Sequence, residues 1–441
     1  MGYYVETEFN FPCKRIPAVI DKFIRRTGDS SVSQDKRVIM ISISTIDKTE
    51  YTLLQCLRQS LQQSGNPAVT PSLTDKEWQQ LLILADRHEV LSLLENVWKP
   101  DRFSKEQWLA IQSKTARTVQ RAIQLQVLNA RLTALLEKEG IIAVTLKGCT
   151  VARFYPVPEF RKTTDIDLFV ADREEAKRAL QILEANGFHP SEEWHANHHV
   201  ILNSAKKEVV ELHTTWADEF KEKHLNQSLK KLQKESGQHC QRIDFQGLEV
   251  YAYETAWQGF YLMIHMLQHF VGSGFGLRNL CDWVVLWENC DDAKEREDFW
   301  RMVCQSGTAE FAKAVTAICV NDLGLSKEKS PVPAENPVEQ EVIDALLRDI
   351  LDAGEFGYSE AERMVGMDGD AWTAYVREFH HQMHINFPKV GKIIFLWPVL
   401  WIATLVRFLR NNKRLNRAPI SAIMKKAGKR GQLVSRLTSS K

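Results

Sequence analysis

Paired cysteines are missing from this 441-residue chain. Its eight cysteines are scattered, and none forms a C-x-x-C pair. A secreted domain held by disulfides would carry cysteines more densely, and a zinc ribbon would carry them in pairs. The N-terminus also lacks the apolar segment of a signal peptide. These absences indicate a reducing compartment and predict a cytoplasmic protein.

An excess of either charge is also missing. The chain has 57 Lys and Arg residues against 56 Asp and Glu residues, a net charge of about +1. A protein that follows a phosphate backbone usually presents a broad basic field. The balance therefore argues against an extended nucleic-acid partner, although it leaves room for a local basic patch.

The chain has no apolar run long enough to span a membrane. The run 393–406 has only 14 residues and contains Pro398, whereas a spanning helix needs about 20. Its tryptophans and the basic residues that follow would suit a membrane interface. The run predicts either a helix packed into the core, the commoner outcome, or peripheral membrane contact through 393–410.

Composition and periodicity predict an α+β protein. Residues 1–39 are polar and predict a disordered leader, or translation that starts at Met40. Residues 40–139 are read as an N-terminal helical region, in which Leu128, Leu132, Leu135 and Leu136 recur at helical spacing. Three further regions are expected: a core with a small mixed β-sheet at about 140–253, a C-terminal helical region at 254–390, and an apolar helix with a basic tail at 391–441.

Within the core, short β-branched or alternating runs predict the strands. They lie at 141–146, 165–170, 198–204 and 207–213, and 239–253 predicts an edge hairpin. Between the second and third strands, Asp172 is placed to cap a helix that Gly187 ends. The order of elements is helix, strand, short helix, strand, helix, strand, strand.

Two acids open the second predicted strand. Asp165 and Asp167 are separated by one residue, so both side chains point to one face, about 7 Å apart. Adjacent carboxylates repel each other unless a cation lies between them. Such oxygen ligands suit Mg²⁺, with Mn²⁺ as an alternative. A D-x-D pair alone is weak evidence, since most such pairs are solvated or turn residues, but here the flanking residues are apolar.

Other residues strengthen this interpretation. Glu211 lies on a later strand and could complete a set of three metal-binding carboxylates. Lys147 and Gly148 form a turn between a strand and a helix, where backbone N–H groups can meet an anion. Lys147 and Arg161 could neutralise phosphate charge, and His213 could orient Glu211 or contact phosphate.

At these residues the chain resembles the polymerase-beta-type nucleotidyltransferase superfamily, and more closely its bacterial group of uncharacterised nucleotidyltransferases. The resemblance covers roughly 50–410, but only 146–170 is specific. The matching residues are Leu146, Lys147, Gly148, Tyr155, Arg161, Asp165, Asp167, Leu168, Glu211, Leu212 and His213. The turn departs from the superfamily pattern because Lys147 replaces the first small residue of the usual Gly-Ser pair.

The resemblance implies an Mg²⁺-dependent nucleotidyltransferase that moves a nucleoside monophosphate from an NTP such as ATP to a hydroxyl or phosphate of a small-molecule or peptide acceptor. It implies catalytic and metal-binding roles for Asp165, Asp167 and Glu211, and nucleotide-binding roles for Lys147, Gly148, Arg161 and His213. Two alternatives stay open: a non-catalytic nucleotide-binding or regulatory module, and a metal-dependent phosphohydrolase.

Histidines supply a further alternative. His195, His198, His199 and His213 lie around the predicted strands and could bind zinc, but no H-E-x-x-H motif occurs and carboxylates outnumber what such a site needs. His265 and His269 lie four residues apart on a predicted helix, and Arg278 and Asp282 share a helix face and could pair with each other. The sequence assigns no role to His265, His269 or Asp282, no acceptor and no oligomeric state.

Overall fold

The computed structural model describes residues 46–62, 72–191, 199–355, 380, 383–384, 386–387, 390, 393–414 and 420–438. The chain divides into a unit of residues 1–47 and a unit of residues 48–441, and the second is described below. The predicted leader 1–39 and the candidate zinc ligands His195 and His198 lie outside the described residues.

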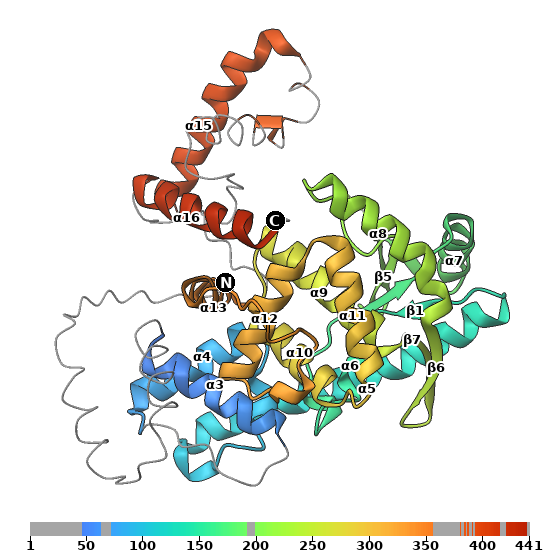
Figure 1. Ribbon diagram of the computed structural model, residues 1–441, viewed down its shortest axis with the longest axis horizontal. Helices are drawn as coiled ribbons and strands as arrows, with labels where there is room; N and C mark the ends of the chain where they lie inside the picture. The colour runs from blue at the N-terminus through green and yellow to red at the C-terminus, as the bar shows by residue number, and fades with distance from the viewer. Residues whose placement is uncertain are drawn as a thin grey trace. The chain divides into compact units, whose positions relative to one another are not determined.

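The second unit contains a mixed sheet of seven strands, which confirms the predicted α+β class (Figure 1). The strand order is β3-β4-β5-β2-β1-β7-β6. β2 runs parallel to β5, and β1 runs parallel to β7 and antiparallel to β2. The strands are β1 (Val144–Thr145), β2 (Ile166–Phe169), β3 (Phe188–Pro190), β4 (His199–Ser204), β5 (Val209–His213), β6 (Cys240–Phe245) and β7 (Leu248–Tyr253).

Helices precede, interrupt and follow the strands. Before the sheet come α3 (Lys48–Leu61), α4 (Asp75–Arg87) and α5 (Lys105–Lys138); among the strands lie α6 (Cys149–Ala152), α7 (Arg173–Ala185) and α8 (Lys223–Ser236). After the sheet come α9 (Thr255–Val271), α10 (Leu277–Glu288), α11 (Ala293–Ser306), α12 (Ala309–Asp322), α13 (Gln340–Ala353), α15 (Trp397–Arg414) and α16 (Ile420–Thr438).

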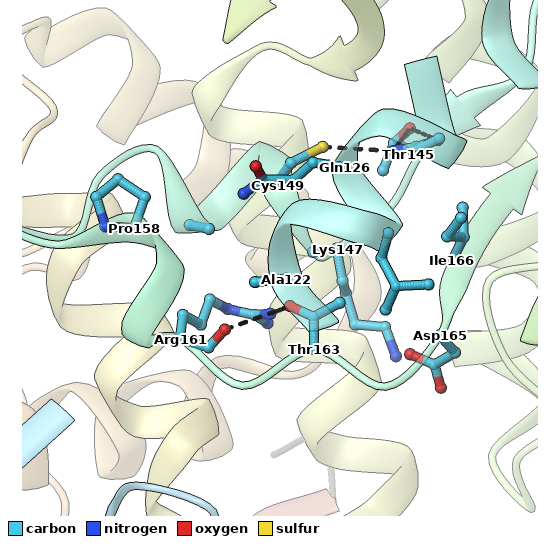
Figure 2. A pocket seen from close by; sticks show the side chains of 14 residues that line it. Ala122, Gln126, Thr145, Lys147, Cys149, Pro158, Arg161, Thr163, Asp165 and Ile166 are labelled. Atoms are coloured by element: carbon cyan, nitrogen blue, oxygen red, sulfur yellow. Dashed lines mark hydrogen bonds between the residues drawn. The ribbon is translucent and has the colours of Figure 1, made fainter. Parts of the chain in front are cut away.

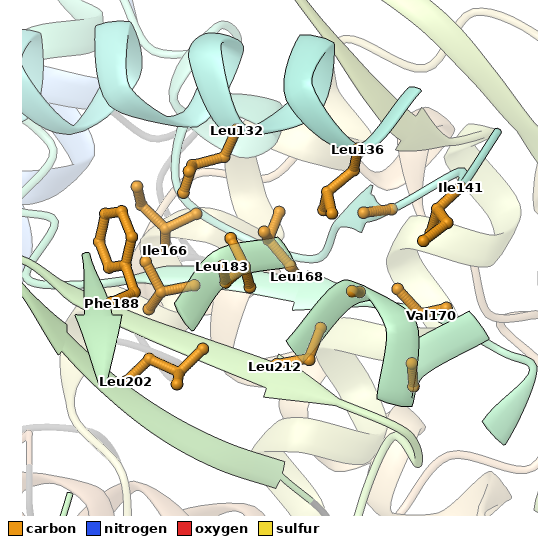
Figure 3. Packing of buried hydrophobic residues seen from close by; sticks show 14 of the residues in the cluster. Leu132, Leu136, Ile141, Ile166, Leu168, Val170, Leu183, Phe188, Leu202 and Leu212 are labelled. Atoms are coloured by element: carbon orange, nitrogen blue, oxygen red, sulfur yellow. The ribbon is translucent and has the colours of Figure 1, made fainter. Parts of the chain in front are cut away.

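One face of the sheet packs against α5 and α7. Because side chains alternate along a strand, Ile166, Leu168 and Val170 point to this face, where leucines of both helices cover them (Figure 3). Val210 and Leu212 of β5 join the same cluster. The alternate residues of the two strands, which include Asp167, Glu211 and His213, must therefore point to the opposite face.

The helix predictions on the α5/α7 side are confirmed in detail. Leu128, Leu132 and Leu136 of α5 are buried in the cluster, and Leu135 packs at its edge. The chain leaves α5 through Gly140, whose φ of +75° favours glycine. At the start of α7, Asp172 Oδ1 accepts hydrogen bonds from the backbone N–H groups of Glu174 (2.8 Å) and Glu175 (2.9 Å).

The opposite face packs against α9 through aromatic side chains. Trp216 lies near Phe169 of β2 and near Trp257 and Phe260 of α9, with ring centroids 6.0–6.2 Å apart. Gln258 of α9 also donates a hydrogen bond to the carbonyl of Leu146 (2.7 Å). These contacts fix α9 over the turn that follows β1.

Two predictions need correction. The edge hairpin exists as β6 and β7, but a further edge strand, β3, was missed because Pro190 and the exposed His189 give it no apolar alternation. The run 393–406 was expected above all to pack into the core, yet Ile394 and Phe395 are 65% and 92% exposed. None of the described helices is long and apolar enough to cross a membrane.

Candidate active site

The carboxylates of the predicted site are brought together by the pairing of β2 with β5. The two strands run parallel, and Asp167 lies directly opposite Glu211. Asp165 immediately precedes β2 and, two residues from Asp167, faces the same side. Asp167 is buried, with 3% of its surface exposed. The sheet thus places all three acids along the wall that faces α9.

Two histidines extend this row of polar side chains. His199 of β4 lies opposite His213 of β5, and their ring centroids are 4.9 Å apart. His213 Nε2 lies 3.2 Å from Asp167 Oδ1 and 3.3 Å from Glu211 Oε2. His213 therefore joins the two facing acids, as the prediction that it orients Glu211 requires.

Lys147 and Gly148 lie in the turn after β1, next to these acids. Lys147 Nζ is 3.2 Å from Asp167 Oδ1 and 3.1 Å from His265 Nε2. Gly148 has a φ of +70°, a conformation that side-chain-bearing residues rarely adopt. The helix that follows, α6, has only four residues, so its dipole adds little and Lys147 supplies most of the positive charge.

Arg161 is buried, with 2% of its surface exposed, and is paired with Asp282 of α10. Its Nε and Nη2 each donate to one carboxylate oxygen at 2.7 Å. Its Nη1 donates to Thr163 Oγ1 at 3.2 Å. Tyr155 also donates to Asp282 (2.6 Å). These bonds hold the segment 161–163 in place. They also use most of the N–H donors of the Arg161 side chain.

A cavity of about 240 Å³ brings the predicted site residues together. All seven predicted site residues, from Lys147 to His213, line this cavity. His199, His265, His269 and Arg278 line it as well. A narrow cleft of about 10 Å³, room for about one water, continues behind the turn toward α5. Figure 2 shows this cleft, with Lys147 and Asp165 on one side and Arg161 turned toward Thr163.

The centre of the site is a charge network. Burial alone would raise the pKa of Asp167, but Lys147 and the hydrogen bond from His213 outweigh it and hold that pKa well below its usual range. Burial would lower the pKa of Lys147 and of His213, yet the facing carboxylates raise both. Asp167 is therefore ionised, held between the Lys147 ammonium and the ring of His213.

The groups at the edge of this network behave differently. Burial and the charge of Asp167 raise the pKa of Asp165 to about 6. Burial and the charge of Lys147 lower the pKa of His265 well below its usual value and that of His269 to about 4. Both α9 histidines are thus neutral at pH 7, and His265 Nε2 can accept a hydrogen bond from the Lys147 ammonium.

A second ionic network, which the sequence did not reveal, closes one side of the cavity. Arg278 donates to Glu355 through Nε (3.0 Å) and Nη2, and lies 3.6 Å from Glu89. Glu89 also pairs with Lys162 (2.6 Å). The predicted pair of Arg278 and Asp282 is therefore wrong. Arg278 pairs with Glu355 and Asp282 with Arg161, each on another element.

The donor chemistry of the three acids fits Mg²⁺ or Mn²⁺, since both ions favour carboxylate oxygens. Asp165, Asp167 and Glu211 supply only oxygens and share one wall of the cavity. Lys147 Nζ and His213 Nε2 already contact Asp167. A bound cation would therefore share this carboxylate with them.

Comparison with known proteins shows which family the chain belongs to. The model of a family described as uncharacterised nucleotidyltransferase matches residues 74–323, more than half of the chain. The chain belongs to the uncharacterised nucleotidyltransferase family. The matched region includes every predicted site residue of this nucleotidyltransferase-family chain, from Lys147 to His213.

Two further comparisons add little. No curated protein matches the chain. Among solved structures it is similar to an antigenic nucleotidyltransferase-like protein from Paracoccidioides brasiliensis, at 15% identity and a TM-score of 0.28, over 41% of this chain and 88% of that one.

Proposed function

We propose that this family member is a metal-dependent nucleotidyltransferase that moves a nucleoside monophosphate from an NTP to a hydroxyl or phosphate of an acceptor. The observation that carries the proposal is the facing pair Asp167 and Glu211, with Asp165 on the same wall of the cavity. The reaction forms a bond between an acceptor oxygen and the α-phosphorus and breaks the bond from that phosphorus to pyrophosphate, which leaves.

Each predicted residue receives a role in this reaction. Asp165, Asp167 and Glu211 would hold Mg²⁺ or Mn²⁺, which when bound neutralises phosphate charge and activates the attacking oxygen. Glu211 would also accept the proton of a hydroxyl acceptor. Lys147 faces the cavity and would bind phosphate oxygens, while the Gly148 turn lets the backbone approach them.

His213 and Arg161 act on their neighbours. His213 holds Asp167 and Glu211 in place from one ring nitrogen. Nε and Nη2 of Arg161 donate to Asp282, and only Nη1 donates to Thr163. We therefore propose that Arg161 does not bind phosphate itself but holds Thr163 in place beside the phosphates. This narrows the role that the sequence suggested for Arg161.

The size of the cavity indicates which part of the substrates it holds. Its volume of about 240 Å³ lies below the ~300–1,000 Å³ of typical small-molecule pockets. It suits the triphosphate and the reacting group of the acceptor, with the nucleoside projecting outward. The near-zero net charge of the chain favours a small or peptide acceptor over an extended nucleic acid.

The test is incubation of the purified chain with Mg²⁺ and each α-labelled NTP, with a cell extract as the source of acceptors. We expect pyrophosphate release and a labelled acceptor. Asp167→Asn should abolish both, and Asp244→Asn, at an exposed acid on β6, should leave both unchanged. Phosphate release without a labelled acceptor would make the chain a phosphohydrolase; NTP binding without turnover would make it a binding module.

A further inference from the structure

A second group of potential metal ligands lies on the same wall of the cavity. His199, Glu211 and His213 each offer one ligand atom, and these atoms all lie within 4.8 Å of one another. We propose that the three side chains form a binding site for a transition-metal dication of the Zn²⁺ type. The site stands on its own geometry, goes beyond nucleotidyl transfer, and shares only Glu211 with the oxygen site.

The sheet itself produces the convergence. Glu211 and His213 are two residues apart on β5 and so point to one face. His199 reaches that face from β4 because it pairs directly with His213. Since neighbouring strands fix all three positions, the ligands need no loop movement to meet.

The distances between the ligand atoms are close to those that such an ion requires. The Nε2 atoms of His213 and His199 lie 3.3 Å and 3.8 Å from the same carboxylate oxygen, Glu211 Oε2. A tetrahedral ion with bonds of about 2.0–2.1 Å separates its ligand atoms by about 3.4 Å. Small side-chain rotations would bring all three atoms into bonding range, and His213 Nε2 would give up its hydrogen bond to Asp167 for the bond to the ion.

The ligand types select the ion. Imidazole nitrogen favours Zn²⁺ and its transition-metal neighbours, whereas Mg²⁺ prefers oxygen. One histidine is enough to hold Glu211 in place, and His213 already contacts its Oε2 atom. His199 places a second imidazole nitrogen 3.8 Å from the same oxygen, and two nitrogen donors beside one carboxylate favour Zn²⁺ over Mg²⁺.

The site has an open side. His199, Glu211 and His213 all line the 240 Å³ cavity. Three protein ligands with a fourth position open to a cavity are typical of catalytic rather than structural zinc. A phosphate oxygen or a water could take that position beside Asp167.

The inference is tested by titrating the full-length protein with Zn²⁺ in a calorimeter. We expect the wild-type protein to bind one equivalent of Zn²⁺. The Kd for Zn²⁺ should rise at least about 10-fold in His199→Ala. His199→Gln, which keeps most of the volume and so guards against misfolding, should give the same loss. The matched control is His239→Ala, since His239 also pairs with a carboxylate, Glu254, at 2.9 Å but lies at the surface.

X-ray absorption of the zinc-loaded protein supplies a second readout. We expect ligands at about 2.0–2.1 Å with imidazole scattering and no sulfur shell at about 2.3 Å. An unchanged Kd in both His199 variants, or a sulfur shell, which would place the ion on cysteine, would overturn the site.

Asp165→Asn separates this inference from nucleotidyl transfer. It should leave zinc binding intact while abolishing transfer. Normal zinc binding in a wild-type chain without transferase activity would overturn only the proposed function. Active transfer without the zinc equivalent would overturn only the zinc site.

Discussion

Asp167 and Glu211 face each other from two parallel strands, and His213 joins them with one ring nitrogen 3.2 Å from the first carboxylate and 3.3 Å from the second. The acids are therefore held by strand pairing and not by a loop. A substitution that keeps the shape of either side chain should leave the sheet intact, so its effects can be assigned to the charge that it removes.

Glu211→Gln is the first such substitution. The amide oxygen can still accept a hydrogen bond from His213, but the negative charge toward the metal is lost. We expect kcat to fall at least about 100-fold and the Mg²⁺ concentration for half-maximal rate to rise, measured as pyrophosphate release. Glu249→Gln, at an exposed acid of β7, should behave as wild type; an unchanged Mg²⁺ dependence in Glu211→Gln would contradict the assignment.

Most of the strands, and the fact that the acids share one face, could be predicted from the sequence. Both follow from the alternation of apolar and polar residues along each strand. Asp165 and Asp167 must point one way if Ile166 and Leu168 point the other, and the buried cluster contains Ile166 and Leu168. What alternation could not supply was the strand order. Only the structure shows that β5 lies beside β2 and brings Glu211 opposite Asp167.

Partners far apart along the chain were beyond prediction. Helix spacing suggested that Arg278 pairs with Asp282, four residues away. In the fold, Asp282 meets Arg161 and Arg278 meets Glu355, pairs separated by 121 and 77 residues. Helix spacing predicts only partners on the same helix. A buried arginine pairs instead with the carboxylate that accepts two well-aligned hydrogen bonds, wherever it lies in the sequence.

The pair Arg161–Asp282 should be important for stability. Asp282→Ala would leave the buried guanidinium without its carboxylate, and we expect the free energy of unfolding to fall by about 3–5 kcal/mol. Urea denaturation measures this. The exposed pair Lys230–Glu219, 3.3 Å apart, provides the control, because Glu219→Ala should change stability little. An equally small effect of Asp282→Ala would show that the pair is not needed.

Asp322 at the end of α12 should make stability depend on pH. Burial and the nearby charge of Asp344 raise its pKa to about 6, although Arg58 opposes them. Because the folded protein binds this proton more tightly than the unfolded chain, whose ordinary pKa is about 3.9, stability falls as pH rises between these two values and stays lower above pH 6.

Asp322→Asn removes this titration. The free energy of unfolding should rise by about 1–3 kcal/mol at pH 7.5 and change little at pH 4. Denaturation curves at the two pH values measure the difference, with Asp244→Asn, at an exposed position, as the control. A gain of the same size at both pH values would point to packing and not to charge.

The exposed apolar side chains of α15 and the turn before it predict attachment to an anionic membrane. Phe395 is 92% exposed and Ile402 is 64% exposed, and the basic Arg407 and Arg410 that follow are exposed as well. Apolar side chains can enter the acyl boundary while arginines meet anionic headgroups. The chain should therefore sediment with vesicles that contain phosphatidylserine and much less with neutral ones.

Substitution of either apolar residue tests this surface. Phe395→Asp and Ile402→Asp should each lower vesicle binding about 10-fold or more, since a buried apolar side chain contributes about 1.5–3 kcal/mol. Ile83→Asp is the matched control, because Ile83 is 69% exposed on α4 and lies outside this surface. Equal losses in all three variants would indicate non-specific adsorption. Self-association without vesicle binding would assign the apolar surface to a second copy of the chain.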